Sequence, residues 1–167
     1  MSRFSGVYLF TKTLKTIMDK LKKQAETLND LVLINNDRVE GYQKAIDQLR
    51  SEDADLRHVF QERVDQSRQF HLELVNEVAR LGEDVKEGTM ASGKIYRAWM
   101  DVKAFFSGGD RKTVLDNCED GEDAAVRAYN EALECENLTP EQRALIIRQH
   151  AEVKASHDRI KAMRDSL

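Results

Sequence analysis

Apolar residues recur at steps of three and four along most of the chain, the spacing of amphipathic helices that pack one face against their neighbours. The first such run predicts a helix that begins near residues 11–13 and ends at about Leu49. Its one polar interruption, Asn35, suggests a kink or break, so the bundle helix could instead start nearer Thr27. The apolar positions of this run are Leu14, Ile17, Leu21, Ala25, Leu28, Val32, Val39, Tyr42, Ile46 and Leu49.

Turn and capping residues divide the rest of the chain into further helices. A second helix is predicted from about Asp53 to Leu81, followed by Gly82 as a C-terminal stop. A third is predicted over 111–136. The sequence "TPEQ" then supplies an N-cap threonine, a first-turn proline and a capping-box glutamine, which open a fourth helix that runs close to the C-terminus.

The connection between the second and third long helices decides the topology. Residues 82–110 are too many for a simple hairpin, and a short helix is predicted within them, over about 91–106. Sixteen helical residues span roughly 24 Å, enough to pass from one end of a bundle to the other. The prediction is an all-α, ferritin-like four-helix bundle with a long crossover that contains a short extra helix. The bundle is assigned to residues 27–167, and residues 1–26 to an N-terminal extension that is helical from about residue 12.

Composition supports helices and narrows the classes of function. Charged residues make up 34% and apolar residues 41% of the 167, with one Pro and eight Gly, which favours long helices. The net charge of -4, with both signs interspersed, argues against nucleic-acid binding. The apolar stretch "VYLF" is too short for a signal peptide, no stretch is long enough to span a membrane, and the two cysteines suggest no disulfide, so a cytoplasmic protein is expected. Membrane-surface binding by the extension, through its aromatic residues, is the weaker alternative.

Five segments carry a resemblance to a known family: "EGYQKA", "RQFHLELVNEVARLG", "YRAWMDVKAFFSGGD", "CEDGEDAAVRAYNEAL" and "EVKASHDRIKAMRD". From about residue 27 to the C-terminus, the chain resembles a bacterial family of ferritin-like four-helix-bundle proteins of unknown function. The wider group includes stress-associated bacterial proteins, and many ferritin-like proteins hold two iron or manganese ions. The resemblance therefore implies the fold, and it raises a stress association and a di-metal site as expectations.

Glu122 raises the main chemical question. It falls on or beside an apolar stripe made by Leu115, Cys118, Ala125, Tyr129 and Ala132, where an unpaired carboxylate would be costly. Three interpretations stand. Glu122 could pair with an Arg or Lys of a neighbouring helix, join a buried network with Tyr42 or Tyr129, or ligate a metal.

The metal interpretation needs carboxylates and imidazoles that converge from all four helices. Such sites usually take one Glu from each of two helices and a Glu-x-x-His pair from each of the others, and this sequence contains no Glu-x-x-His. Counting residues from the helix ends places Glu40, Glu62, Glu122 and His150 at one height in the bundle. The candidate ligands for iron or manganese are Glu40, Glu62, Glu119, Glu122, His150 and His157, with His71 nearer the other end.

Two functional hypotheses from different classes result. The first is a non-enzymatic bundle of unknown biochemical activity that acts through protein interaction or self-association, as a homo-oligomer for example. The second is a metalloprotein with iron or manganese and oxygen or peroxide chemistry. The missing Glu-x-x-His pairs favour the first hypothesis.

Overall fold

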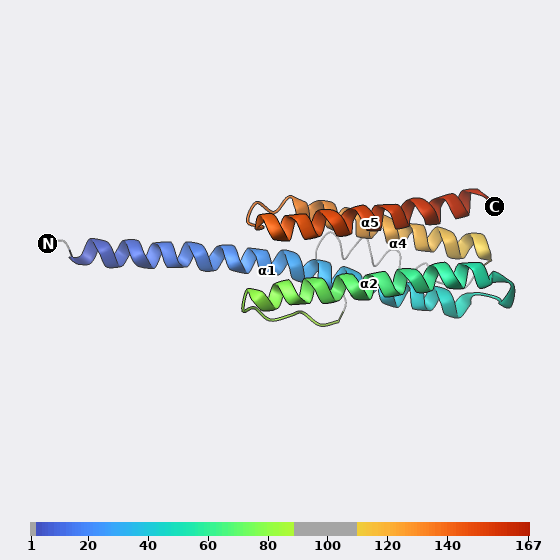
Figure 1. Ribbon diagram of the computed structural model, residues 1–167, viewed down its shortest axis with the longest axis horizontal. Helices are drawn as coiled ribbons and strands as arrows, with labels where there is room; N and C mark the ends of the chain where they lie inside the picture. The colour runs from blue at the N-terminus through green and yellow to red at the C-terminus, as the bar shows by residue number, and fades with distance from the viewer. Residues whose placement is uncertain (1–2, 89–109) are drawn as a thin grey trace.

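Four long helices make up the part of the chain that the structure describes (Figure 1). The computed structural model describes residues 3–88 and 110–167, and within these two ranges no strand occurs. The elements are α1 (Arg3–Gln48), the 3-10 turn η1 (Ser51–Asp53), α2 (Ala54–Arg80), α4 (Arg111–Leu133) and α5 (Pro140–Asp165). The predicted all-α class and the four predicted long helices are confirmed, whereas the short helix predicted over 91–106 lies outside the described residues.

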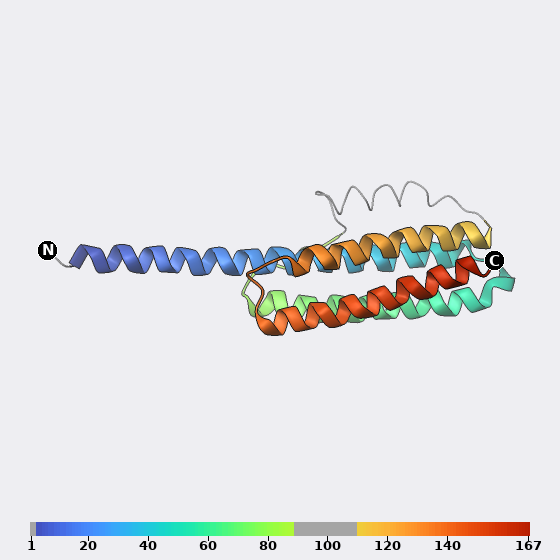
Figure 2. The same ribbon diagram turned by 90° about the horizontal axis from the view of Figure 1, so that it is seen from above.

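The order and direction of the helices give the predicted crossover topology (Figures 1 and 2). α1 and α2 form an antiparallel pair, and so do α4 and α5. α2 and α4 run in the same direction, because Arg111 at the start of α4 forms ion pairs with Asp53 and Asp55 at the start of α2, at 2.9 and 2.5 Å. The chain between Arg80 and Arg111 therefore returns from one end of the bundle to the other.

Local sequence signals account for the ends of the helices. The side chain of Thr139 accepts a hydrogen bond from the backbone N–H of Gln142 (3.1 Å), and the Gln142 side chain accepts one from the backbone N–H of Thr139 (3.0 Å). This is the predicted capping box. Asp110 caps α4 through the backbone N–H of Thr113 at 2.9 Å. Gly82, which follows α2, has a φ of 71°, a conformation that suits glycine.

α1 differs from its prediction in two ways. It begins at Arg3 rather than near residues 11–13, because the segment before Thr11 contains no proline and one tolerated glycine does not stop a helix. It also continues without a break past Asn35 to Gln48. The side-chain amide of Asn35 donates to the carbonyl oxygen of Leu31 at 2.9 Å, one turn earlier, so this buried polar group has a partner within the continuous helix.

The first part of α1 projects beyond the other three helices (Figures 1 and 2). Every residue from Gly6 to Lys20 is exposed, and the next buried residue along α1 is Gln24. The Gln24 amide donates to the carbonyl oxygen of Asn137 at 2.7 Å, in the connection between α4 and α5. Gln24 therefore marks the end of the bundle, and we call residues 3–23 the arm.

The bundle core consists of apolar side chains from all four helices, in two clusters along its length. The cluster nearer the arm contains Leu28, Phe70, Tyr129 and Val153, and the other contains Phe60 and further residues. Small buried residues of α4, among them Gly121, Ala124, Ala125 and Ala128, allow close packing of neighbouring helices. No helix of the described residues has the length and apolar character needed to cross a membrane.

Asp30 is a half-buried carboxyl at the arm end of the bundle. Burial raises its pKa, Lys86 opposes the rise, and Glu26 and Glu131 add to it. A carboxyl whose pKa is higher in the folded state than in the unfolded state stabilises the fold only at low pH, and that contribution is lost as pH rises above about 4. The charged form of Asp30 therefore destabilises the bundle at neutral pH.

We expect Asp30→Asn to raise the melting temperature at pH 7 by about 1–2 °C, corresponding to on the order of 0.5 kcal/mol. The gain should disappear below about pH 4, where the carboxyl is protonated in both states. Thermal unfolding followed by circular dichroism at both pH values measures the effect. Asp19→Asn, in the exposed arm, is the matched control and should change nothing; an equal gain from both variants would contradict the explanation.

Candidate functional site

A buried ion pair between α1 and α4 lies at the centre of the bundle. Arg38 is 2% exposed and Glu122 is 1% exposed. Nη2 of Arg38 donates to both carboxylate oxygens of Glu122, at 2.8 and 3.1 Å. This contact answers the question that the sequence raised about Glu122: its charge is balanced by a guanidinium in the core.

Polar groups of all four helices extend the pair into a network, which we call the central network. The Tyr42 hydroxyl donates to Glu122 at 2.5 Å, so Glu122 has both an arginine and a tyrosine partner. Arg38 also donates to the amide oxygen of Gln66 on α2 at 3.2 Å. That oxygen accepts from the hydroxyl of Ser156 on α5 at 3.1 Å. The network thus joins α1, α2, α4 and α5 at one level.

The electrostatics of the central network raise the pKa values of Arg38 and of two groups beside the ion pair, Tyr42 and Cys118. Burial acts to lower the pKa of Arg38, but Glu122 outweighs it, and the pKa is raised. Burial and the nearby Glu122 charge raise the pKa of Tyr42 well above its ordinary value, and the same two causes raise the pKa of the Cys118 thiol. Tyr42 is therefore a neutral hydrogen-bond donor, and Cys118 is a neutral thiol rather than a nucleophile.

A second buried network lies nearer the arm. The Tyr129 hydroxyl accepts from the Asn35 amide at 2.9 Å and donates to the Gln149 side chain at 2.8 Å. The Gln149 amide donates in turn to Glu73 at 2.8 Å, and Glu73 forms an ion pair with Arg148 at 2.5 Å at the surface. Burial raises the pKa of Tyr129, so this hydroxyl also stays protonated. The network runs from the core to solvent and holds all four helices together.

The other candidate ligands do not converge on Glu122. Glu40 is half-exposed and pairs with Lys44 at 2.6 Å on the surface of α1. Glu62 contacts Arg159 at 3.0 Å and Arg63 at 3.2 Å. Both carboxylates therefore have cationic partners outside the core.

Glu119 and His157 meet at the interface of α4 and α5. Nε2 of His157 lies 3.9 Å from Glu119 and 3.0 Å from Asp123, while Glu119 also forms an ion pair with Arg164. His150 packs its ring near Tyr129, with 6.4 Å between ring centroids. The structure therefore brings Glu119 and His157 together, and it places Glu40, Glu62 and His150 apart from both.

The donor set does not fit a di-metal centre. Such a centre needs free carboxylates that face one another, but Glu122 faces the positive guanidinium of Arg38 and accepts its hydrogen bonds. Within residues 3–88 and 110–167, no group of three or more His, Cys, Asp or Glu side chains is placed to hold a metal ion. The positive charge beside the Glu122 carboxylate comes from Arg38, whereas in a di-metal centre it comes from the metal ions.

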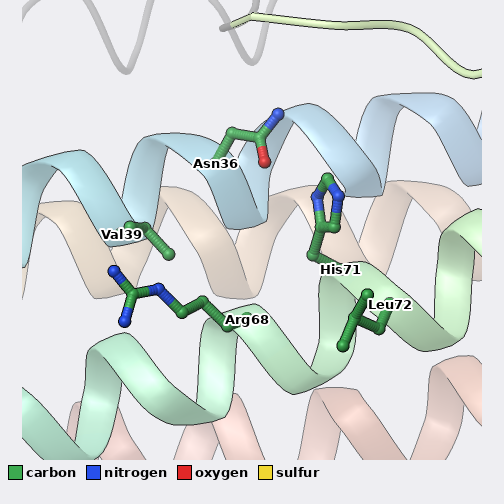
Figure 3. A pocket seen from close by; sticks show the side chains of 5 residues that line it. All are labelled: Asn36, Val39, Arg68, His71 and Leu72. Atoms are coloured by element: carbon green, nitrogen blue, oxygen red, sulfur yellow. The ribbon is translucent and has the colours of Figure 1, made fainter.

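A shallow groove of about 430 Å³ lies between α1 and α2 (Figure 3). His71 extends from α2 toward α1, on the side where Asn36 lies. Nδ1 of His71 is buried and has no hydrogen-bond partner among the described residues. The Asn36 amide donates to the carbonyl oxygen of Gly88 at 2.8 Å, the last described residue before 110. The lining of the groove consists of Asn36, Val39, Arg68, His71 and Leu72.

Sequence reasoning missed Arg38, although a signal for it exists. Leu28 and Leu31 begin a seven-residue repeat on the buried face of α1, and the repeat places Asn35, Arg38 and Tyr42 on that face. Following the apolar residues alone leads to Val39 instead, which is only partly buried. A charged residue at a core position of the repeat was the available clue to the partner of Glu122.

The fold and the core together define a ferritin-like four-helix bundle. A solved structure titled "Crystal structure of ferritin like, diiron-carboxylate proteins from Bacillus anthracis str. Ames" matches with a TM-score of 0.67 at 12% sequence identity, covering 87% of this chain and 97% of that chain. At this identity the likeness shows the fold alone. The chain belongs to the family described as Domain of unknown function (DUF2383), whose model matches residues 23–135. A search among curated proteins finds no match.

Proposed function

We propose that this protein is a non-catalytic helical bundle that acts through protein association, with the arm as its contact surface. The observation that carries the proposal is the exposed apolar side chains of the arm, which project beyond the bundle: Val7, Tyr8, Leu9, Phe10, Leu14, Ile17 and Met18. Proteins seldom expose so many large apolar groups together without a partner. The core supports the proposal, since its polar groups are engaged in the two networks rather than arranged around a substrate.

A photo-crosslinking amino acid at Leu14, introduced into the full chain in its native cells, tests this proposal. We expect crosslinks from position 14 and few from Lys12, which lies about 200° around the helix from Leu14. Equal, background-level crosslinking from both positions would overturn the association function. The stress association and the cytoplasmic location stay predictions, and a rise in abundance after oxidant exposure would support the first.

Metal binding is the second candidate function, and the likeness to a solved structure described as a ferritin-like, diiron-carboxylate protein favours it. Its ligands would come from Glu40, Glu62, Glu119, Glu122, His150 and His157. Against it stands the ion pair of Glu122 with Arg38, at 2.8 Å. The two functions make different predictions for metal content.

Protein offered Fe(II) or Mn(II) without oxygen and then desalted should retain well under one metal ion per chain by elemental analysis. Glu122→Gln should retain the same amount, because the carboxylate is already occupied by Arg38. Near-stoichiometric metal that is lost in Glu122→Gln would establish the metalloprotein instead. Glu87→Gln, an exposed substitution, controls for loosely bound ions.

A further inference from the structure

The apolar side chains of the arm include a regular stripe. Val7, Phe10, Leu14, Ile17 and Leu21 follow one another at alternating steps of three and four. The first four are exposed by 64%, 69%, 47% and 50%. This alternation is the a and d pattern of a coiled coil, in which every seventh residue returns to the same face.

The stripe continues directly into the buried face of α1. The next positions of the same repeat are Gln24, Leu28 and Leu31, all buried against the other three helices. One face of a single helix therefore packs in the bundle over its second half and is uncovered over its first half. The arm has the same side-chain pattern as the part of α1 that already packs against helices.

The composition beside the stripe indicates a helical partner rather than a membrane surface. From Phe10 onward the flanking positions hold Thr11, Thr13, Met18 and Lys20, three of them polar, so the apolar face is narrow there, whereas helices that lie in membranes present a broad one. Lys20 is the one lysine at a flanking position. The lysines that point away from the stripe are Lys12, Lys15, Lys22 and Lys23.

Resting on the proposed function, we propose that the partner is a second copy of this chain, whose arm pairs with this arm in an antiparallel coiled coil. The direction follows from the shape of the molecule (Figures 1 and 2). From Gln24 onward, the stripe face of α1 is covered by the protein's own helices. A parallel partner in register would place its bundle in the same space, whereas an antiparallel partner places its bundle beyond the tip of the arm.

The antiparallel pairing makes the stripe complementary to itself. When Leu14 of one arm lies opposite Phe10 of the other, Ile17 lies opposite Val7, and Gln24 stays within its own bundle. The repeat then gives four layers in which a positions face d positions. The overlap of about 19 residues is roughly 28 Å long and ends before each bundle begins.

The size of this contact predicts a weak dimer. The exposed stripe residues offer on the order of 500 Å² per arm, so the pair would bury about 1,000 Å², at the lower end for specific interfaces. Both arms are basic, since residues 3–23 contain six Lys or Arg and one Asp. We therefore expect a dissociation constant on the order of micromolar, and tighter association as added salt screens the lysines.

Sedimentation equilibrium of the full chain tests the dimer. Ile17→Glu should weaken it at least about 100-fold, because each copy would bury a carboxylate in the seam. Thr16→Glu introduces the same charge on the outer face and should leave the dimer intact. A monomer at about 100 µM, or a dimer that Ile17→Glu does not weaken, would overturn the proposal.

Cysteine crosslinking tests the direction in a Cys135→Ser background, with Cys118 left in place because it is buried. Val7→Cys combined with Ile17→Cys should give a disulfide-linked dimer whose mass-mapped peptides join position 7 to position 17. Either substitution alone should crosslink poorly, since identical positions lie about 15 Å apart along the antiparallel pair. Efficient crosslinking of the single variants would overturn the antiparallel arrangement.

The experiments separate this inference from the proposed function. A monomer whose position 14 crosslinks to another protein in cells would overturn the self-paired arm and leave the association function in place. A monomer that binds phosphatidylglycerol vesicles through Ile17, and not Thr16, would assign the arm to a membrane surface and also overturn the dimer. A chain that stays monomeric, binds no vesicles and gives no crosslinks from position 14 would overturn both the self-paired arm and the association function.

Discussion

Arg38→Met is expected to lower the free energy of unfolding by about 3–5 kcal/mol, which corresponds to roughly 10 °C in melting temperature. The variant leaves the Glu122 carboxylate buried, with the Tyr42 hydroxyl as its remaining partner in the central network. A buried charge without its counter-ion costs far more than the lost contact alone. Urea unfolding followed by circular dichroism measures the loss.

The double variant Arg38→Met/Glu122→Gln should recover most of that stability. It removes both charges, and the new amide can still accept from Tyr42. Recovery is expected because Nε and Nη1 of Arg38 have no hydrogen-bond partner among the described residues, so the native pair is not fully satisfied. Arg68→Met, at an exposed position of α2, should change stability by less than about 0.5 kcal/mol. A double variant as unstable as Arg38→Met would contradict the buried-charge explanation.

Alkaline pH should destabilise the bundle steeply. The pKa values of Cys118, Tyr42 and Tyr129 are raised from ordinary values of 9.0, 10.0 and 10.0. An acidic group whose pKa is higher in the folded state than in the unfolded state stabilises the fold fully at pH values below the unfolded-state pKa. This contribution to the free energy of unfolding is lost as the pH rises above the unfolded-state pKa. Each group then costs about 1.4 kcal/mol per pH unit, so the three should remove on the order of 5 kcal/mol by about pH 11.

Urea unfolding at several values between about pH 8 and about pH 11 measures this loss. Tyrosinate absorbance from Tyr42 and Tyr129 should appear together with unfolding. Tyr129→Phe should be less stable at neutral pH, by about 1–3 kcal/mol, because Gln149 loses its donor. Above about pH 10 its stability should fall less steeply than that of the parent. A stability that stays constant to pH 11 would contradict the raised pKa values.

The sequence predicted the fold well because helix patterns and capping residues act locally. The capping box of Thr139 and the stop at Gly82 place helix ends from a few neighbouring residues. The crossover followed from the length of one connection. The start of α1 was missed because only Val7 and Phe10 of the apolar stripe precede Thr11, and two positions are too few to define a helical period.

The site was predicted less well because residue counting gives a height along the bundle but not a direction around each helix. Glu40 was placed near Glu122 by height, yet it lies two residues from Arg38, about 200° around α1, and so reaches the surface. Glu122 was singled out correctly as a carboxylate on an apolar stripe. Its partner required the seven-residue repeat, which puts a cation on the buried face.

The long repeat of α1 also makes its axial position ambiguous, and the central ion pair removes that ambiguity. Apart from Gln24, Asn35 and Arg38, apolar residues occupy the same seven-residue period from Val7 to Ala45, so a slip of one repeat would still present a mostly apolar face to the bundle. Such a slip would bring Leu31 or Ala45 opposite Glu122 and leave its carboxylate buried without Arg38, at a cost of several kcal/mol. The Arg38–Glu122 pair therefore fixes the axial position of α1. It determines how much of this helix is packed inside the bundle and how much is left outside to form the arm.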